Sequence, residues 1–170
     1  MFLELIAAIA AAFAAAGLAL ALNRLSGGRL PRWAMPAAAG AALLGYAVWS
    51  EYSWYGRVSG ALPEGVRVTY ANEARALWRP WTYLAPVVNR FVALDTDSIR
   101  RNPDVPHQRV ADLYFYGRWS PRRGVQVVVD CREGRIAPLP TAEFDESGAA
   151  VRAAWEAPLP GDRTLEAACD

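Results

Sequence analysis

The two cysteines are the residues of this chain with the most distinctive chemistry. Cys131 lies in the apolar, strand-like stretch VVVDCREG, and Cys169 is the next-to-last residue, in LEAACD. Such a pair can bind a metal, act in nucleophilic chemistry or form a disulfide bond. The choice depends on the compartment of the domain, because disulfides persist in oxidising compartments.

Metal binding and catalysis both require further residues that the sequence does not supply near the cysteines. A structural zinc site takes about four ligands, but the chain has a single histidine, His107, in a proline-flanked loop, and no CxxC motif. A nucleophilic cysteine needs a base, and nothing in the sequence ties His107 to Cys131. We therefore expect no catalytic residue, no metal site and no cofactor.

Two groups of acidic residues are weaker candidates for chemistry. Asp95, Asp97 and Asp104 lie in one polar region, but their spacing does not match that of an EF-hand loop. Asp130 and Glu133 lie on either side of the internal cysteine, and paired carboxylates need a cleft to act as acid and base. A solvated loop is the favoured interpretation of the first group, and the sequence indicates no cleft for the second.

Two further groups are candidates for binding a partner. They are the arginines Arg118, Arg122 and Arg123, and the tyrosines Tyr114 and Tyr116. The arginines surround a predicted hairpin tip, where they would bind a lipid headgroup, a glycan or an acidic protein. With Trp78 and Trp81, the tyrosines would form an exposed aromatic patch. A plain charged tip and a second small core are the alternatives.

The first third of the chain predicts a two-helix transmembrane hairpin over residues 1–56, with spans at about 4–22 and 34–52. The run LIAAIAAAFAAAGLALAL, from Leu5 to Leu22, carries no charge and has nearly the length of a membrane span. The second run, AMPAAAGAALLGYAVWS, is followed by an aromatic cluster typical of a membrane interface. A buried soluble helix and a cleaved signal peptide are the alternatives, and a signal peptide would begin with positive charge.

The linker between the two runs predicts the orientation. NRLSGGRLPRW contains Arg24, Arg29 and Arg32 and no acidic residue. By the positive-inside rule it stays in the cytoplasm, so both termini and the C-terminal domain would lie in the periplasm, anchored in a bacterial inner membrane. A net charge of +1 offers no basic face for nucleic acid.

Residues 57–170 predict a periplasmic α+β domain with a small antiparallel β-sheet and short helices. The clearest element is a hairpin in which RVADLYFYGRW and GVQVVVDC are strands and SPRRG is the turn. GVRVTY, NRFVALD and RIAPL are further strand candidates. We expect a loop at DSIRRNPDVPHQ, a short helix at ANEARALW, a packed loop at WRPWTYLAP, and a C-terminal helical turn capped by Asp162.

This compartment favours the disulfide among the three roles of the cysteines. Cys131 shares a strand face with Val125, Val127 and Val129, so it points toward the core. The bridge Cys131–Cys169 would close a loop of roughly 38 residues and contribute about 4 kcal/mol by the chain-entropy account. It would also hold a terminus that otherwise frays.

The last 80 residues or so resemble the surface-adhesin protein E family of bacterial domains. The similarity rests on ALDTDSIRRN, VVVDCREGRIAPL, FDESGA and WEAPLPGDRTLEAAC. The resemblance implies a small antiparallel sheet with a bridged cysteine pair, and named members of that family bind host proteins at the cell surface. This chain differs in its two apolar runs and in lacking a lipoprotein cysteine near its N-terminus.

These observations predict a membrane-anchored periplasmic protein that is not an enzyme and acts through protein–protein contact, such as an accessory subunit of an envelope complex. The alternative is an adhesin-like module that recognises an envelope or extracellular polymer through the arginine-rich hairpin. The expected partners are the lipid bilayer and a protein, and no nucleic acid.

Overall fold

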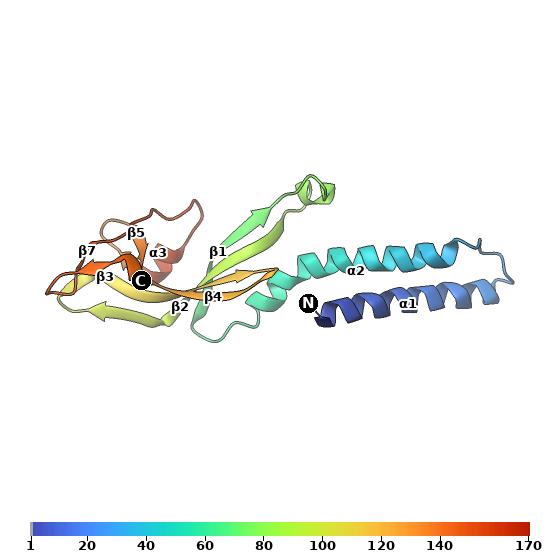
Figure 1. The fold of residues 1–170 in the computed structure, drawn as a ribbon, viewed down its shortest axis with the longest axis horizontal. Helices are drawn as coiled ribbons and strands as arrows, with labels where there is room; N and C mark the ends of the chain where they lie inside the picture. Colours follow the sequence, from blue (N-terminus) through green and yellow to red (C-terminus); the bar gives the residue numbers. More distant parts are fainter. Residues whose placement is uncertain (1) are drawn as a thin grey trace. The chain divides into compact units, whose positions relative to one another are not determined.

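The computed structural model describes residues 2–170. The chain forms two compact units, one ending at Trp54 and one comprising Tyr55–Asp170. We describe each unit by itself. Figure 1 shows the helices of the first unit in blue and cyan and the strands of the second in green to red.

The first unit is an antiparallel pair of helices, α1 (Phe2–Leu25) and most of α2 (Ala34–Ser59). In the turn between them, the side-chain oxygen of Asn23 accepts a hydrogen bond from the Leu30 N–H at 3.0 Å. Near the other end of the pair, the hydroxyl of Ser50 donates to Glu4 Oε1 at 3.3 Å. These two contacts lie at the two ends of the helix pair.

The first of the two predicted membrane spans coincides with a helix whose length and composition would allow it to cross a membrane. Among the described residues, α1 is the one helix long and apolar enough to cross a membrane, and none of its residues is buried. The second helix, α2, is less apolar because Tyr46, Trp49 and Glu51 interrupt its alanines. An N-terminal apolar helix is therefore present, and a two-span hairpin is not confirmed.

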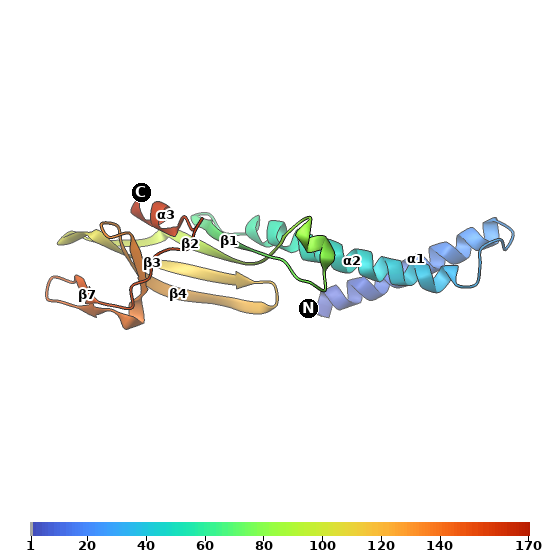
Figure 2. The ribbon, with the colours of Figure 1, turned by 90° about the horizontal axis from the view of Figure 1, so that it is seen from above.

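The second unit is built on an antiparallel meander. Within residues 2–170, the five strands of this sheet run in sequence order: β1 (Val66–Ala74), β2 (Val87–Asn102), β3 (Val105–Gly117), β4 (Ser120–Asp130) and β5 (Arg135–Pro138). The predicted α+β class with an antiparallel sheet is confirmed. Figure 2 shows β3 and β4 extending together as a long hairpin.

Strands β2 and β3 are longer than the sequence predicted. The loop expected at DSIRRNPDVPHQ is wrong, because strand pairing continues on both sides of a short turn at Pro103–Asp104. Between Asp95 and Arg100 the register shifts, and there Ser98 Oγ accepts a bond from the Asp112 N–H at 2.9 Å. A polar side chain thus replaces a carbonyl partner in the bulge, which lets a polar sequence remain in the sheet.

Two other local predictions are wrong for related reasons. ANEARALW forms no helix, because its first half completes β1 and pairs with β2 as far as Ala74 opposite Val87; sheet pairing overrides a weak helix preference. SPRRG is not the turn but the start of β4, and the turn is Arg118–Trp119. Gly124 instead admits the ring of Tyr114, since a Cβ atom there would lie 3.1 Å from that ring.

The C-terminal helix α3 (Thr164–Cys169) covers one end of one sheet face, as predicted for the tail. Ala168 is fully buried against a core formed by Leu94, Ala111, Leu113, Val127 and Val129. The predicted cap lies one residue too early: the N-cap position is Arg163, whose side chain makes no cap bond, and Asp162 before it accepts a bond from the Thr164 N–H through Oδ1 at 2.8 Å. This carboxylate satisfies a helix donor that would otherwise lack a partner.

Other residues of the same unit cover parts of the opposite sheet face. Phe91 stacks on Tyr116 with ring centroids 4.6 Å apart, and Tyr55 meets Phe91 edge-on at 5.4 Å. Farther along this face, Gln108 bonds the backbone of Ala150 in the small hairpin of β6 (Glu143–Phe144) and β7 (Ala150–Arg152). The remaining elements are short 3₁₀ turns, η1 (Pro80–Tyr83) and η2 (Leu139–Thr141).

Candidate functional site

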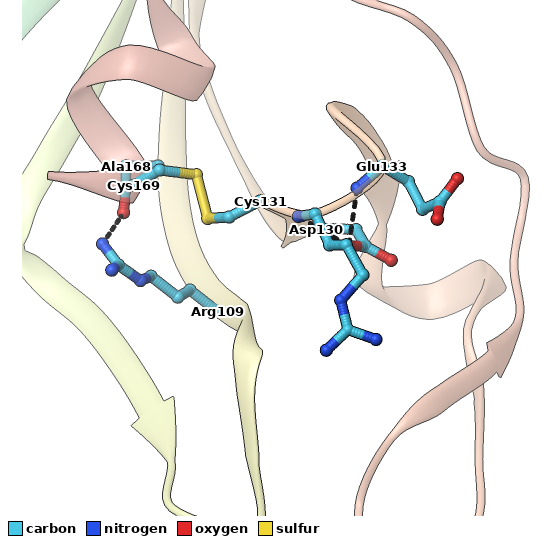
Figure 3. Close-up of a disulfide and its surroundings, with 7 residues drawn as sticks. Arg109, Asp130, Cys131, Glu133, Ala168 and Cys169 are labelled. Carbon is cyan, nitrogen blue, oxygen red and sulfur yellow. Dashed lines mark hydrogen bonds between the residues drawn. A yellow bond between two sulfur atoms is a disulfide. The ribbon is translucent and has the colours of Figure 1, made fainter.

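The cysteines form a disulfide that fastens α3 to the end of β4. The sulfur atoms of Cys131 and Cys169 are 1.98 Å apart, and the two Cα atoms are 5.8 Å apart (Figure 3). Beside the bridge, the guanidinium of Arg109 donates to the Ala168 carbonyl at 2.6 Å. A cation at a helix C-terminus satisfies a terminal carbonyl. Since both sulfurs are bonded, neither is a thiolate nucleophile in this state.

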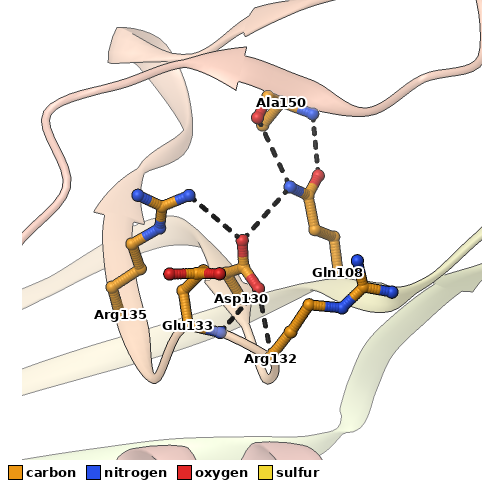
Figure 4. Close-up of polar contacts among 6 residues, drawn as sticks. All are labelled: Gln108, Asp130, Arg132, Glu133, Arg135 and Ala150. Carbon is orange, nitrogen blue, oxygen red and sulfur yellow. Dashed lines mark hydrogen bonds and ion pairs between the residues drawn. The ribbon is translucent and has the colours of Figure 1, made fainter.

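The carboxylate of Asp130 organises the turn after β4. Its Oδ1 accepts bonds from the N–H groups of Arg132 and Glu133 at 3.1 and 3.2 Å, and its Oδ2 lies 3.5 Å from Gln108 Nε2 and 3.4 Å from Arg135 (Figure 4). Burial raises the pKa of Asp130, but these donors outweigh burial and hold the pKa below its ordinary value. Asp130 therefore has a structural role.

The face that α3 covers continues beyond the helix as an open apolar groove. Strand pairing places Val92 opposite Phe115 and Leu113 opposite Val125, on the same face as the core residue Leu94. Val92 and Val125 are half-buried and Phe115 is 42% exposed. Together they line an open cleft of about 880 Å³. We call this cleft the groove.

One wall of the groove is a segment that crosses from one sheet edge to the other, residues 156–163, here called the crossing segment. At one end, Glu156 and Ile136 of β5 exchange backbone hydrogen bonds at 2.8 and 2.9 Å. At the other end, the Arg163 N–H donates to the Thr69 carbonyl of β1 at 3.0 Å. Pro158 and Leu159 line the groove between these two attachments.

The groove carries charges of both signs. Arg90 and Arg123, both exposed, line it from β2 and β4, whereas Glu156 and Asp162 line it from the crossing segment. An apolar floor between opposite charges can hold apolar side chains of a ligand and fix its direction by ion pairing. Within residues 2–170, no group of three His, Cys, Asp or Glu side chains is arranged to hold a metal ion.

The structure divides the predicted arginine and tyrosine set into separate places. Arg123 lines the groove, whereas the Arg122 guanidinium lies 5.1 Å from the Tyr114 ring centroid. Arg118 lies in the turn, 4.6 Å from the centroid of the Trp119 ring. Tyr116 belongs to the Phe91 stack and is half-buried, so it serves packing.

The structure also shows where two other predicted groups lie. Trp78 and Trp81 lie in the loop between β1 and β2, whereas Tyr114 and Tyr116 lie on β3. Asp95 Oδ1 accepts a bond from the Asp97 N–H at 3.1 Å, and Asp104 donates its N–H to Asn102 at 3.1 Å. These acidic residues therefore shape turns and bulges, as their short spacing allows.

The groove itself was not predicted. In the sequence, the residues of its floor show only the alternating pattern of a strand, which does not indicate a groove. Arg90 lies outside the predicted arginine set. The available signal was the Pro- and Gly-rich stretch APLPGD, which is unsuited to helix or strand and therefore favours a surface segment. A comparison with family models, with curated proteins and with solved structures finds no match for this chain.

Proposed function

We propose that this chain is a non-catalytic, membrane-anchored domain that binds a segment of a partner protein in the groove. The observation that carries the proposal is the uncovered part of the sheet face, where Val92, Phe115 and Val125 form an apolar floor beside α3. An apolar surface that a domain leaves uncovered, with charged residues around it, is characteristic of an interaction site.

In this proposal α1 anchors the protein in the membrane, and we propose in addition that α2 forms a second span. The spans would lie at about 4–22 and 34–52, and the linker arginines would remain cytoplasmic. Both termini and the sheet domain would then lie on the periplasmic side of a bacterial inner membrane. The disulfide supports this placement, because such bonds persist in oxidising compartments.

The groove suits an extended protein segment better than a small molecule. It is open along the sheet and bounded by arginines on one side and carboxylates on the other, so a ligand with apolar residues and an acidic residue near Arg123 would fit it. Its walls are preorganised, because the crossing segment is attached at both ends by backbone hydrogen bonds. Preorganisation reduces the ordering cost of binding.

Site-specific photo-crosslinking in the full-length protein tests this proposal. A photoreactive residue at Phe115 should give one discrete adduct with an envelope protein, whereas the same residue at Gln126 should give none. Gln126 is a matched control because it is exposed on the opposite face of the hairpin. Equal adducts at both positions, or an adduct at Gln126 alone, would contradict binding in the groove.

Substitutions in the groove and at the hairpin tip extend the same test. R123E should weaken capture of the crosslinked partner, and F115A should weaken it by at least about tenfold, as for a central interface residue. R122E is the control, because Arg122 stacks on Tyr114 and does not line the groove. If R122E and R123E weaken capture equally, the partner binds the hairpin tip instead.

That last outcome corresponds to the second candidate function, an adhesin-like module that recognises an envelope or extracellular polymer. The observation that favours it is the tip itself, where Arg118 and Arg122 stack on Trp119 and Tyr114. Guanidinium and aromatic groups together suit an anionic glycan or another acidic polymer. The resemblance to the surface-adhesin protein E family agrees with this candidate.

For the polymer candidate, the double variant R122A/R123A should lose retention on an anionic glycan column and should lose the salt dependence of retention. Its thermal midpoint should change little, because exposed substitutions usually alter stability by under about 0.5 kcal/mol. Retention that is the same for variant and parent at every salt concentration would exclude the tip as the binding surface.

A further inference from the structure

The loop between β1 and β2 exposes an unusual amount of apolar surface. We call residues 75–86, of sequence RALWRPWTYLAP, the aromatic loop. Leu77, Trp78 and Leu84 are 82, 79 and 92% exposed, and Trp81 and Tyr83 are 43 and 51% exposed. The sequence predicted a packed loop at WRPWTYLAP, and that prediction is wrong for Trp78, Trp81, Tyr83 and Leu84.

Internal hydrogen bonds give the aromatic loop a fixed backbone. Thr82 is only 2% exposed, and its hydroxyl accepts a bond from the Ala76 N–H at 2.9 Å and donates to the Arg79 carbonyl at 2.7 Å. Thr82 belongs to a 3₁₀ turn, Pro80–Tyr83, that begins with proline. The polar residue therefore points inward and the large apolar residues point outward, the reverse of a packed loop.

We infer that the aromatic loop inserts into the interfacial layer of a lipid membrane. Tryptophan and tyrosine favour the headgroup level of a bilayer, and leucine favours the acyl region below it. The loop carries Arg75 and Arg79 and no acidic residue, which is complementary to anionic headgroups. A fixed backbone with exposed apolar side chains needs no further ordering to insert.

A lipid surface is chosen over a protein because the chain supplies its own membrane anchor. Residues 60–65 are all that separate the end of α2 from the start of β1, the strand that leads into the aromatic loop. With α1 in a bilayer, that short connection keeps the sheet domain near lipid. The inference thus rests on the anchoring part of the proposed function, and it adds a second, peripheral membrane contact.

Depth-dependent quenching in the reconstituted full-length protein tests the inference. An environment-sensitive fluorophore is attached to the introduced cysteine of L84C, L18C or V151C, with the native disulfide left intact. All three positions are exposed, at 92, 63 and 63%, so labelling should not disturb folding. A mass consistent with the retained Cys131–Cys169 bridge shows that labelling was confined to the introduced cysteine.

The vesicles contain phosphatidylcholine with or without phosphatidylglycerol, and the quenchers are spin-labelled lipids with shallow or deep labels. The Leu84 site should show blue-shifted emission and quenching by the shallow label, increased by phosphatidylglycerol. The Leu18 site, in α1, should be quenched by the deep label, and the Val151 site should be quenched by neither. R75A/R79A should remove the effect of phosphatidylglycerol at Leu84.

The three sites separate the ways in which the inference can fail. If the Leu18 site is not quenched by lipid, the anchor itself is wrong. If the Leu18 site is quenched and the Leu84 site behaves like the Val151 site, the anchor stands and loop insertion is wrong. A Leu84 site that is shielded from both lipid quenchers and aqueous iodide would indicate a covering protein, and it would also overturn lipid insertion.

Discussion

The hydroxyl groups of Thr69 and Thr164 lie 2.8 Å apart, although 95 residues separate them in the sequence. Both residues are buried, and Thr164 Oγ1 is also 2.5 Å from Asp162 Oδ1. A hydroxyl has one proton and a carboxylate only accepts, so Thr164 donates to Asp162 and accepts from Thr69. This chain of bonds connects the start of α3 to β1 and fixes one end of the crossing segment.

We expect T164V to destabilise the domain by about 1–3 kcal/mol, because it leaves the buried Thr69 hydroxyl without its acceptor and Asp162 without one donor. T164S keeps the hydroxyl and is the matched control. The thermal midpoint of the full-length protein in detergent should fall clearly for T164V and less for T164S. Equal losses would indicate that the methyl group of Thr164, rather than its hydroxyl, carries the effect.

Either C131A or C169A should destabilise the domain by about 2–5 kcal/mol, the usual cost of removing a native bridge from a small secreted domain. The double variant should be no less stable than the less stable of the two single variants, because all three variants lack the same bond. Denaturant unfolding under non-reducing conditions measures all three against the parent.

The bridge itself is checked by intact mass before and after reduction. The protein isolated without reductant should be lighter by about two protons than its reduced form, since one disulfide removes two hydrogens. Thiol reagents should label neither cysteine until reduction. Free thiols in protein taken directly from the envelope would remove the main support for an oxidising compartment.

The pH dependence of stability should report on Asp130. Because the folded-state pKa is depressed, its stabilisation is present above the unfolded pKa of about 3.9 and is lost as the pH falls through the folded value. D130N should reduce stability at neutral pH and flatten this acid limb. Its remaining oxygen can still accept the N–H bonds of Arg132 and Glu133, so D130A should be less stable than D130N.

Most of this effect should come from the backbone N–H bonds and not from the ion pair. The Arg135 side chain is 39% exposed, and ion pairs at exposed positions usually contribute under about 1 kcal/mol. R135A should therefore be much milder than D130A. Chemical denaturation at neutral and acidic pH compares the variants, and an R135A loss as large as that of D130A would contradict this division.

The orientation predicted from the linker arginines can be tested with reporter fusions. A reporter that is active only outside the cytoplasm should be active after Asp170 and silent within Ser26–Gly28. The linker site is suitable because Gly27 and Gly28 lie in the exposed turn between α1 and α2. The reverse pattern would overturn the positive-inside argument. A separate measurement of the intact mass would show whether α1 is retained in the mature protein.

Sequence patterns were reliable where one local rule acts alone. The alternation in VQVVVDC predicted a strand with Cys131 on the core face, and the structure confirms both features. Asp162 was predicted as a cap from its type, and it does accept the Thr164 N–H, although the N-cap position itself is Arg163. The apolar run in α1 likewise predicted a helix, because its composition leaves few alternatives.

Local rules failed where a partner strand supplied the deciding interaction. ANEARALW has a fair helix preference, but pairing with β2 is worth more than that preference. The polar stretch after Asp95 remained in the sheet because Ser98 and Asp112 lie close enough in the fold to bond. Neither partner is visible within a local window of sequence.

The sequence by itself determined the apolar N-terminal helix, the strand-rich C-terminal domain and the pairing of its two cysteines, because composition, alternation and residue count are local or global properties of the chain. Tertiary structure alone decided that α3 covers only part of its sheet face and that the aromatic loop turns its large side chains outward. Both features depend on where distant segments end in space: the bridge to Cys131 and the bond to Thr69 fix α3 at one end, and the buried Thr82 fixes the loop.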